Sequence, residues 1–119
     1  MIIDGQIHGG LNEAFAVAMG QLISFDEEGN LQGNSLMDYF IPTFVETPHW
    51  ETDYTVTPSP HHPIGAKGVA ESPHVGGIPC FTNAIVDAFA HQGVTHMDMP
   101  HTAFNVWKTI NKLGLNKQA

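Results

Sequence analysis

Three stretches of the chain carry apolar residues at three- and four-residue steps, which is the period of a helix with one apolar face. They predict helices over residues 10–20, over residues 78–91 and from Thr102 to Gly114. Thr102 suits the N-cap of the third helix, because its hydroxyl can accept a hydrogen bond from a free backbone N–H. Gly93 and Gly114 are placed to end the second and third helices, since glycine readily adopts the left-handed conformation of a helix end.

The segments between these helices predict extended and irregular structure. Residues 22–32 predict a hairpin with an acidic tip, and the alternation of apolar and polar side chains over residues 50–56 predicts a strand. Proline and glycine interrupt residues 33–48 and 57–77, so we expect an irregular segment and a long ordered loop there. Together these elements predict an α+β fold, with about three helices packed on a small sheet. Residues 1–119 are expected to form a single domain or domain fragment, with a frayed tail from Asn116.

Composition narrows the possible partners and the compartment. Twelve Asp and Glu residues against four Lys and Arg give a net charge of −8, which repels the phosphate backbone of nucleic acids. The apolar runs are far shorter than the roughly 18 residues of a membrane-spanning helix. A single cysteine, Cys80, has no intramolecular disulfide partner and suits a reducing compartment. We therefore expect a cytoplasmic protein that binds no nucleic acid and does not insert into membranes.

The segment GAKGVAES, residues 65–72, places Glu71 between small residues just before the second predicted helix. Small neighbours would let a ligand approach this carboxylate closely. A glutamate in apolar surroundings has a raised pKa and can act as a general base near neutral pH. The alternative is an ordinary solvated carboxylate. Lys67 is in the same way either a partner for an anionic ligand or a solvated lysine.

Histidines and glycines offer further candidate sites. Glu71 with His61, His62 and His74 would suit zinc or iron, but the spacing matches no common zinc motif, so we assign no metal ligand. The glycine-rich residues 5–10 and 75–77 are predicted as turns before helices, where backbone N–H groups could bind an anion. Glycines that serve only for tight turns are the alternative. Cys80 is expected as a small core residue in the first turn of the second helix.

Four segments together resemble, in order, the C-terminal end of the molybdenum-binding large subunit of the xanthine oxidase family. The likeness covers essentially the whole chain. Within that family, GAKGVAES is most similar to the carbon monoxide dehydrogenase branch, since other members usually have Gly-Val-Gly-Glu at this place. The segments are GQIHGG (5–10), DYFIPT (38–43), TPSPHHPIGAKGVAESPHVGGIPCFTNAIVDA (57–88) and MPHTAFNVW (99–107).

The resemblance assigns roles to residues of this chain. Glu71 corresponds to the glutamate that lies beside the molybdenum and acts as the base on its hydroxyl or water ligand. Gln6 corresponds to the glutamine close to the pyranopterin. The resemblance also implies backbone contacts with the cofactor at Lys67, Gly68, Val69 and Ala70.

The implied chemistry is oxidative hydroxylation with water as the oxygen source, of carbon monoxide or of an aldehyde or heterocycle. Electrons would leave through iron–sulfur clusters and FAD on the small and medium partner subunits. Large subunits of the family are several times longer. The loop whose cysteine holds copper in true carbon monoxide dehydrogenases lies upstream of the matched region, and Cys80 does not match it. We therefore expect this chain to need the remainder of the large subunit as a separate chain, with copper possible, and to be inactive alone. A non-catalytic assembly module or remnant is the alternative.

Overall fold

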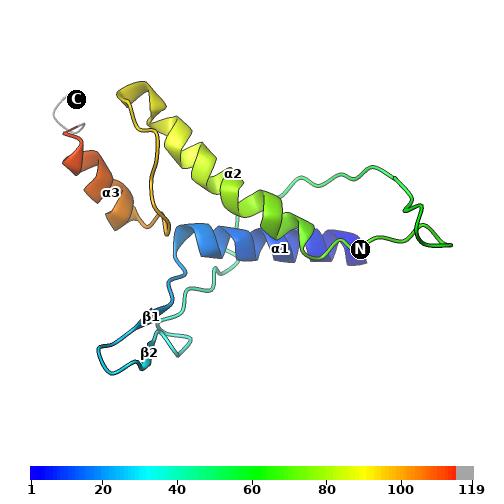
Figure 1. Cartoon of the computed structure of the whole chain (residues 1–119), viewed down its shortest axis with the longest axis horizontal. Coiled ribbons are helices and arrows are strands. Elements are labelled where there is room, and N and C mark those ends of the chain that lie inside the picture. The colour runs from blue at the N-terminus through cyan, green and yellow to red at the C-terminus, as the bar shows by residue number, and fades with distance from the viewer. Residues whose placement is uncertain (115–119) are drawn as a thin grey trace.

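The computed structural model describes residues 1–114, and the tail expected from Asn116 lies outside them. Three α-helices, one antiparallel strand pair and a short 3₁₀ helix make an α+β fold, which confirms the predicted class (Figure 1). No helix in this range combines the length and apolar content that crossing a bilayer requires. The elements are α1 (Ile2–Met19), β1 (Ser24–Phe25), β2 (Leu31–Gln32), α2 (Ser72–Ala88), η1 (Ala90–Gln92) and α3 (Ala103–Lys112).

The two long helices, α1 and α2, cross at a point where both carry small residues. A Cβ atom added to Gly77 of α2 would lie 2.7 Å from the Cβ of Ala14 on α1. A Cβ on Gly10 of α1 would lie 2.9 Å from the Cβ of Pro73. All four residues are buried. The helices can approach this closely only because side chains are missing or short at the crossing.

Aromatic rings pack beside this crossing and form the centre of the core. The ring of Phe81 on α2 meets Phe15 of α1 edge-to-face at 5.5 Å between centroids. Trp50, from the segment between the hairpin and α2, meets Phe81 in the same manner at 6.0 Å. This geometry is the favourable one for aromatic pairs, so Phe81 links three segments that are distant in the sequence.

The hairpin forms as predicted, with Phe25 opposite Leu31 and an acidic turn. Asp26 organises this turn, because its carboxylate accepts hydrogen bonds from the backbone N–H groups of Glu28 and Asn30, at 3.1 and 2.8 Å. Hydrogen bonds from the side chain and the backbone of Asn30, followed by those from the backbone of Glu28 and Gly29, hold the pKa of Asp26 below its ordinary value. Gly29 supplies the positive φ that the turn requires.

Three features of the sequence prediction are wrong. Residues 50–56 form no strand, since no neighbouring strand lies beside them and alternation alone cannot supply a pairing partner. The glycine-rich residues 5–10 and 75–77 are not turns but lie inside α1 and α2, which begin earlier than the apolar stripes indicated. Cys80 is consequently exposed near the middle of α2 rather than buried in a first turn.

Both ends of α3 are formed by residues that the sequence analysis predicted for them. The Thr102 hydroxyl accepts a hydrogen bond from the Asn105 backbone N–H at 3.2 Å, which confirms it as the N-cap. Gly114 follows the helix with a φ of +70°, as expected of a residue that ends it. Ahead of the cap, the His101 backbone N–H donates to the Ala18 carbonyl of α1 at 2.7 Å.

We expect Thr102→Ala to weaken the first turn of α3. Losing an N-cap hydroxyl costs about 1 kcal/mol, and one N–H of the first turn is left without its partner. Backbone amides of this turn should exchange with deuterium about fivefold faster, while amides of α1 should not change. Thr102→Ser, which keeps the hydroxyl, is the control. Equal exchange in all three proteins would contradict the capping role.

His101 is the large polar side chain buried most completely, with 1% of its surface exposed. Its Nε2 atom lies 3.0 Å from the Thr82 hydroxyl of α2, and its Nδ1 atom has no partner in the described part of the chain. Burial, and to a smaller degree the charge of His96, lowers the pKa of His101 below its ordinary value of 6.5. The folded chain therefore favours the neutral imidazole.

This lowered pKa predicts a pH dependence with a definite sign. Below about pH 6.5 the unfolded chain gains a proton on this imidazole more readily than the folded chain does, so stability falls as the pH is lowered from there. Urea unfolding of the purified chain between pH 7.5 and 5 should show this loss. The His101→Gln variant should show a smaller loss over the same range. An identical pH profile for both proteins would contradict the assignment.

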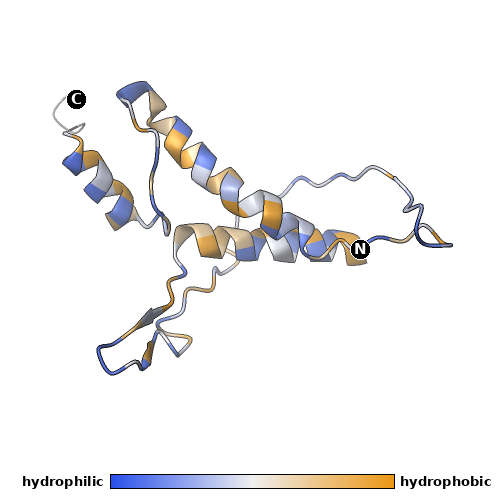
Figure 2. Ribbon diagram, in the orientation of Figure 1, coloured by the Kyte–Doolittle hydropathy of each residue, from blue (hydrophilic) through white to orange (hydrophobic). Residues whose placement is uncertain are grey.

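The fold is extended rather than compact. Its radius of gyration is 18.2 Å, whereas a compact domain of this length would have about 13 Å. Two arms project from the helices: residues 20–48, which carry the hairpin and return to α1 at Phe40 and Thr47, and residues 51–71 (Figure 1). Apolar residues also occur along the arms (Figure 2), and several of their side chains are 81–95% exposed: Leu36, Met37, Phe44, Val45 and Ile64. Exposed apolar surface on this scale is typical of a surface that contacts other protein.

Candidate functional site

Glu71 lies at the junction between the long loop and α2, where it is the N-cap residue. Its backbone carbonyl accepts hydrogen bonds from the N–H groups of His74 and Val75 at 3.1 and 3.3 Å. Its carboxylate is exposed and forms no hydrogen bond or ion pair with residues 1–114. The apolar surroundings expected for a general base are thus not supplied by the described residues, and the carboxylate is free to meet a ligand.

Residues 67–70 lead into Glu71 as an irregular segment with free hydrogen-bond donors. Their backbone N–H groups donate to no acceptor within residues 1–114. Because Gly68 has no atom within 4 Å of the position of a Cβ, its backbone is open to approach. A row of free N–H groups beside an exposed carboxylate can bind a ligand rich in oxygen and nitrogen acceptors.

Lys67 faces the opposite limb of the loop. Its ammonium group donates a hydrogen bond to the Thr57 hydroxyl, which joins the two limbs at their base. Farther out, the Ser59 N–H donates to the Gly65 carbonyl at 3.0 Å, and Gly65 packs against Pro58 with a φ of +70°. These contacts confirm that the loop is ordered, and they show that the ammonium group of Lys67 already has a partner within the loop.

Gln6 is brought near this segment by α1. It is exposed, and it lies four residues before Gly10, on the same face of the helix. A Cβ on Gly10 would lie 3.3 Å from the Ala70 carbonyl oxygen, so the chain that leads into Glu71 passes directly over this face. Gln6 thus lies one helical turn before the point where α1 contacts Ala70, and we call Gln6 together with residues 67–71 the Glu71 edge.

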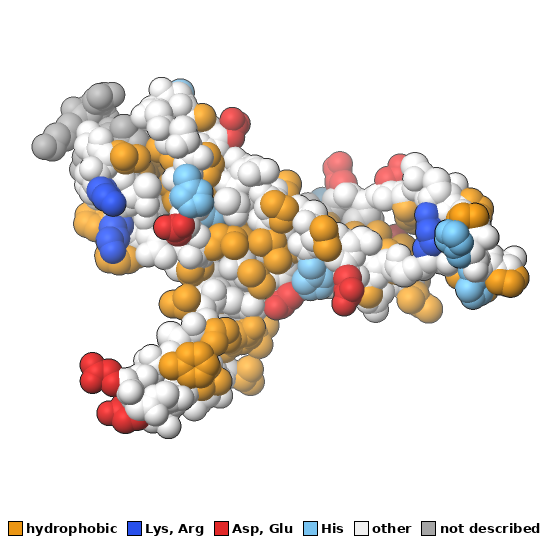
Figure 3. All heavy atoms as spheres, in the orientation of Figure 1, with side chains coloured by type: hydrophobic (Ala, Val, Ile, Leu, Met, Phe, Trp, Pro, Cys, Tyr) orange, Lys and Arg blue, Asp and Glu red, His pale blue; other side chains and the backbone are white. Residues whose placement is uncertain are grey.

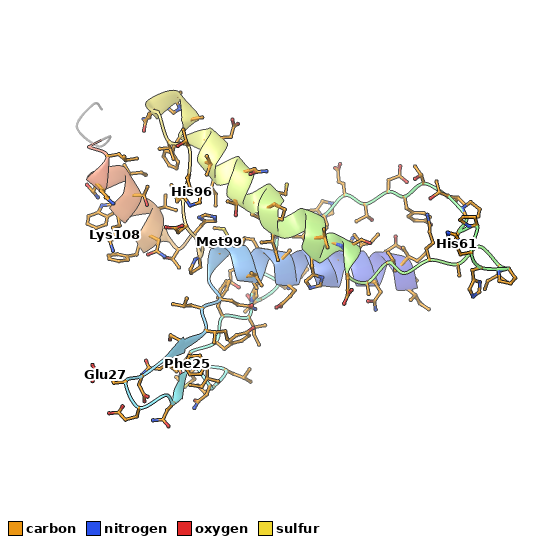
Figure 4. All side chains as sticks on the ribbon, in the orientation of Figure 1. Phe25, Glu27, His61, His96, Met99 and Lys108 are labelled. Carbon is orange, nitrogen blue, oxygen red and sulfur yellow. The ribbon has the colours of Figure 1, made fainter. Side chains whose placement is uncertain are left out.

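The histidines considered as metal ligands do not gather with Glu71 into one cluster, although His74 lies one helical turn from it. His61 lies at the far end of the loop arm, away from the crossing of α1 and α2 (Figure 4). Within residues 1–114 no group of three or more His, Cys, Asp or Glu side chains is arranged to hold a metal ion. The acidic tip of the hairpin, marked by Glu27, projects in another direction from the helices (Figure 4). The structure thus gives no support to the metal cluster of His61, His62, His74 and Glu71.

Two buried polar atoms next to the helix crossing were not identified from the sequence. The Trp50 Nε1 and His74 Nδ1 atoms have no hydrogen-bond partner in the described part of the chain. Buried polar atoms are nearly always paired in complete structures. No local pattern in the sequence could have shown that the indole N–H of Trp50 lacks an acceptor. Both atoms indicate that further groups belong beside the α1–α2 crossing.

Comparisons with known proteins show what the whole chain is similar to. A family profile for the molybdopterin cofactor-binding domain matches residues 1–48. The chain is 75% identical over 97% of its length to the carbon monoxide dehydrogenase large chain of Hydrogenophaga pseudoflava. It is 68% identical over 98% of its length to the large chain of that name from Afipia carboxidovorans. It spans 14% of each relative.

A solved structure shares the arrangement of the elements. The crystal structure of the Cu,Mo-CO dehydrogenase in its carbon monoxide reduced state matches 97% of this chain with a TM-score of 0.90 and 69% sequence identity. The match covers 14% of that chain. The extended shape, with its two arms, is therefore the shape that such a segment has within a much longer polypeptide.

Proposed function

This chain is homologous to one segment of the carbon monoxide dehydrogenase large chain, and on that premise we propose that its Glu71 edge forms one wall of a molybdenum–pterin site. The observation that carries the proposal is the free Glu71 carboxylate next to a row of unpartnered backbone N–H groups. The complete site would be formed by residues 1–119 together with the remainder of a large chain. Residues 1–119 would then act as one unit of the molybdopterin-binding domain.

The residues of the Glu71 edge fit such a cofactor in their chemistry. The Gln6 amide and the N–H groups of residues 67–70 would hold the pterin, which offers both hydrogen-bond donors and acceptors. When bound, the molybdenum–pterin cofactor would supply the two-electron oxidation. The described residues form one side of this site only.

The part of Glu71 in the reaction is proton transfer. Its carboxylate would accept a proton from the water that provides the oxygen atom of the product. Because the described residues leave this carboxylate exposed, we expect the remainder of the large chain to cover Glu71. For carbon monoxide the balance is one CO and one water converted to CO₂, two protons and two electrons.

Other components of the enzyme would come from outside this chain. Copper would be held by groups elsewhere, because Cys80 lies nine residues beyond Glu71 on α2, about 13 Å along the helix axis. FAD-binding and iron–sulfur subunits would take the electrons away. An exposed thiol at Cys80 fits a reducing compartment, which favours a cytoplasmic location.

A segment exchange tests this function. Residues 1–119 would replace the matched segment in the Hydrogenophaga pseudoflava large chain, expressed with its own partner subunits. We expect the exchanged enzyme to bind molybdenum stoichiometrically and to oxidise CO within about tenfold of the parent rate, because 75% of the matched residues are identical. Full molybdenum content without CO oxidation would favour the assembly module. Loss of molybdenum would contradict the proposal.

A further inference from the structure

An apolar groove separates α3 from the pair α1–α2. Its volume is about 670 Å³, and its walls are almost entirely apolar. Figure 3 shows apolar side chains gathered on the surface where α1 and α2 meet. Each of the three helices contributes to the walls, with Phe15 and Met19 from α1, Ile85 from α2, and Val106 and Ile110 from α3. Phe89, which caps the end of α2, also lines the groove.

The width of the groove is fixed by hydrogen bonds at one end. His101 precedes α3 and also lines the groove. Its backbone N–H binds the Ala18 carbonyl of α1, and its imidazole binds the Thr82 hydroxyl of α2. All three helices are thus tied together at this point, so α3 is held in place rather than free to close onto α2.

The third helix has an apolar side without a partner in this chain. None of the α3 residues is buried, although Val106 and Ile110 face α1 and α2 across the groove. Trp107, stacked on Phe104 at 5.9 Å, is still 59% exposed. Contact between water and the apolar side chains on both walls of the groove is unfavourable. The geometry therefore requires an apolar occupant.

We propose that this groove receives an uncharged apolar segment from the part of the large chain outside residues 1–119. This inference rests on the proposed function. Two observations favour this occupant over others: the chain spans only 14% of its relatives, and the solved enzyme keeps the same helix arrangement at a TM-score of 0.90. The groove is therefore a built feature of a longer polypeptide. Since no Asp, Glu, Lys or Arg lines it, the occupant carries apolar side chains.

Bulky and charged substitutions at Ala88 test the proposal in the exchanged large chain. Ala88 is exposed in this chain and lines the groove, so Ala88→Trp fills the space and Ala88→Asp places a charge in it. The same changes at Ala90 are the control, because Ala90 is also exposed but lines a different hollow beside Asn83 and Asp87. We expect both Ala88 variants to lower the yield of assembled, molybdenum-containing enzyme at least tenfold. Both Ala90 variants should stay within twofold.

Separate outcomes distinguish this inference from the proposed function. If the unsubstituted exchanged chain lacks molybdenum, the proposed function fails and the groove assignment fails with it. If that chain assembles but the Ala88 variants assemble equally well, or the Ala90 variants lose as much, the groove assignment alone is overturned. A purified chain that dimerises, and that Ala88→Trp makes monomeric, would also overturn it by identifying a second copy as the occupant. Helical circular dichroism of the purified Ala88 variants should be unchanged, which excludes misfolding as the cause.

Discussion

Glu71→Gln in the exchanged large chain is expected to lower CO oxidation by a factor of about 10²–10⁴, the usual contribution of a general base. Glutamine keeps the size of the side chain and its hydrogen-bonding oxygen but cannot accept a proton near neutral pH. Because the Glu71 carboxylate makes no hydrogen bond within residues 1–114, its loss should leave folding intact. Molybdenum content and electron transfer to the partner subunits should therefore match those of the unsubstituted enzyme.

A control for this substitution is available in the same chain. Glu51→Gln removes another exposed carboxylate, one that lies before the long loop and forms no hydrogen bond in the described structure. It should retain at least half of the activity. If Glu71→Gln were to keep activity within threefold of the unsubstituted enzyme at full molybdenum content, Glu71 would not be the base.

Gly77→Ala is expected to destabilise the crossing of α1 and α2 by about 1–3 kcal/mol, the usual cost of overpacking a tight contact. The new Cβ would lie 2.7 Å from the Cβ of Ala14, closer than two such atoms can approach. One helix must shift away from the other, which also displaces the neighbouring contact between Phe15 and Phe81. Urea unfolding of the purified chain, followed by helical circular dichroism, measures the loss.

Two further variants show whether the close approach is the cause. Gly76→Ala, one position earlier, adds a Cβ in open space and should stabilise the helix by up to about 1 kcal/mol. The double variant Gly77→Ala with Ala14→Gly moves the methyl group from α1 to α2 and should recover part of the loss. If Gly76→Ala and Gly77→Ala behaved alike, helix propensity rather than packing would explain the result.

Features set by local sequence were predicted well. The hairpin, the Thr102 N-cap and the Gly114 helix end each depend on residues within a few positions of one another, and all three occur in the structure. The place of Glu71 directly before the second helix was also predicted from its immediate neighbours, but the described residues do not supply the apolar surroundings expected for it. The specific role of Glu71 came from the family resemblance and stays a proposal.

Features set by contacts between distant residues were missed. The sequence shows a glycine at position 10 and another at position 77, but not that they meet Pro73 and Ala14, and so both were interpreted as turns. Residues 50–56 alternate between apolar and polar side chains as a strand does, yet their backbone joins no sheet. The ring of Trp50 packs against Phe81 instead. The apolar groove beside α3 involves all three helices, and no local pattern could reveal it.

The most direct measurement is purification of this chain from its source at its natural abundance, with mass spectrometry of every accompanying polypeptide and assay of molybdenum and copper in the same fraction. We expect residues 1–119 to arrive with, or as part of, a large molybdenum-containing polypeptide, together with FAD-binding and iron–sulfur subunits. Copper in that fraction would support CO as the substrate. If the chain arrives alone and without molybdenum, Glu71 has no cofactor to serve and the central proposal is wrong.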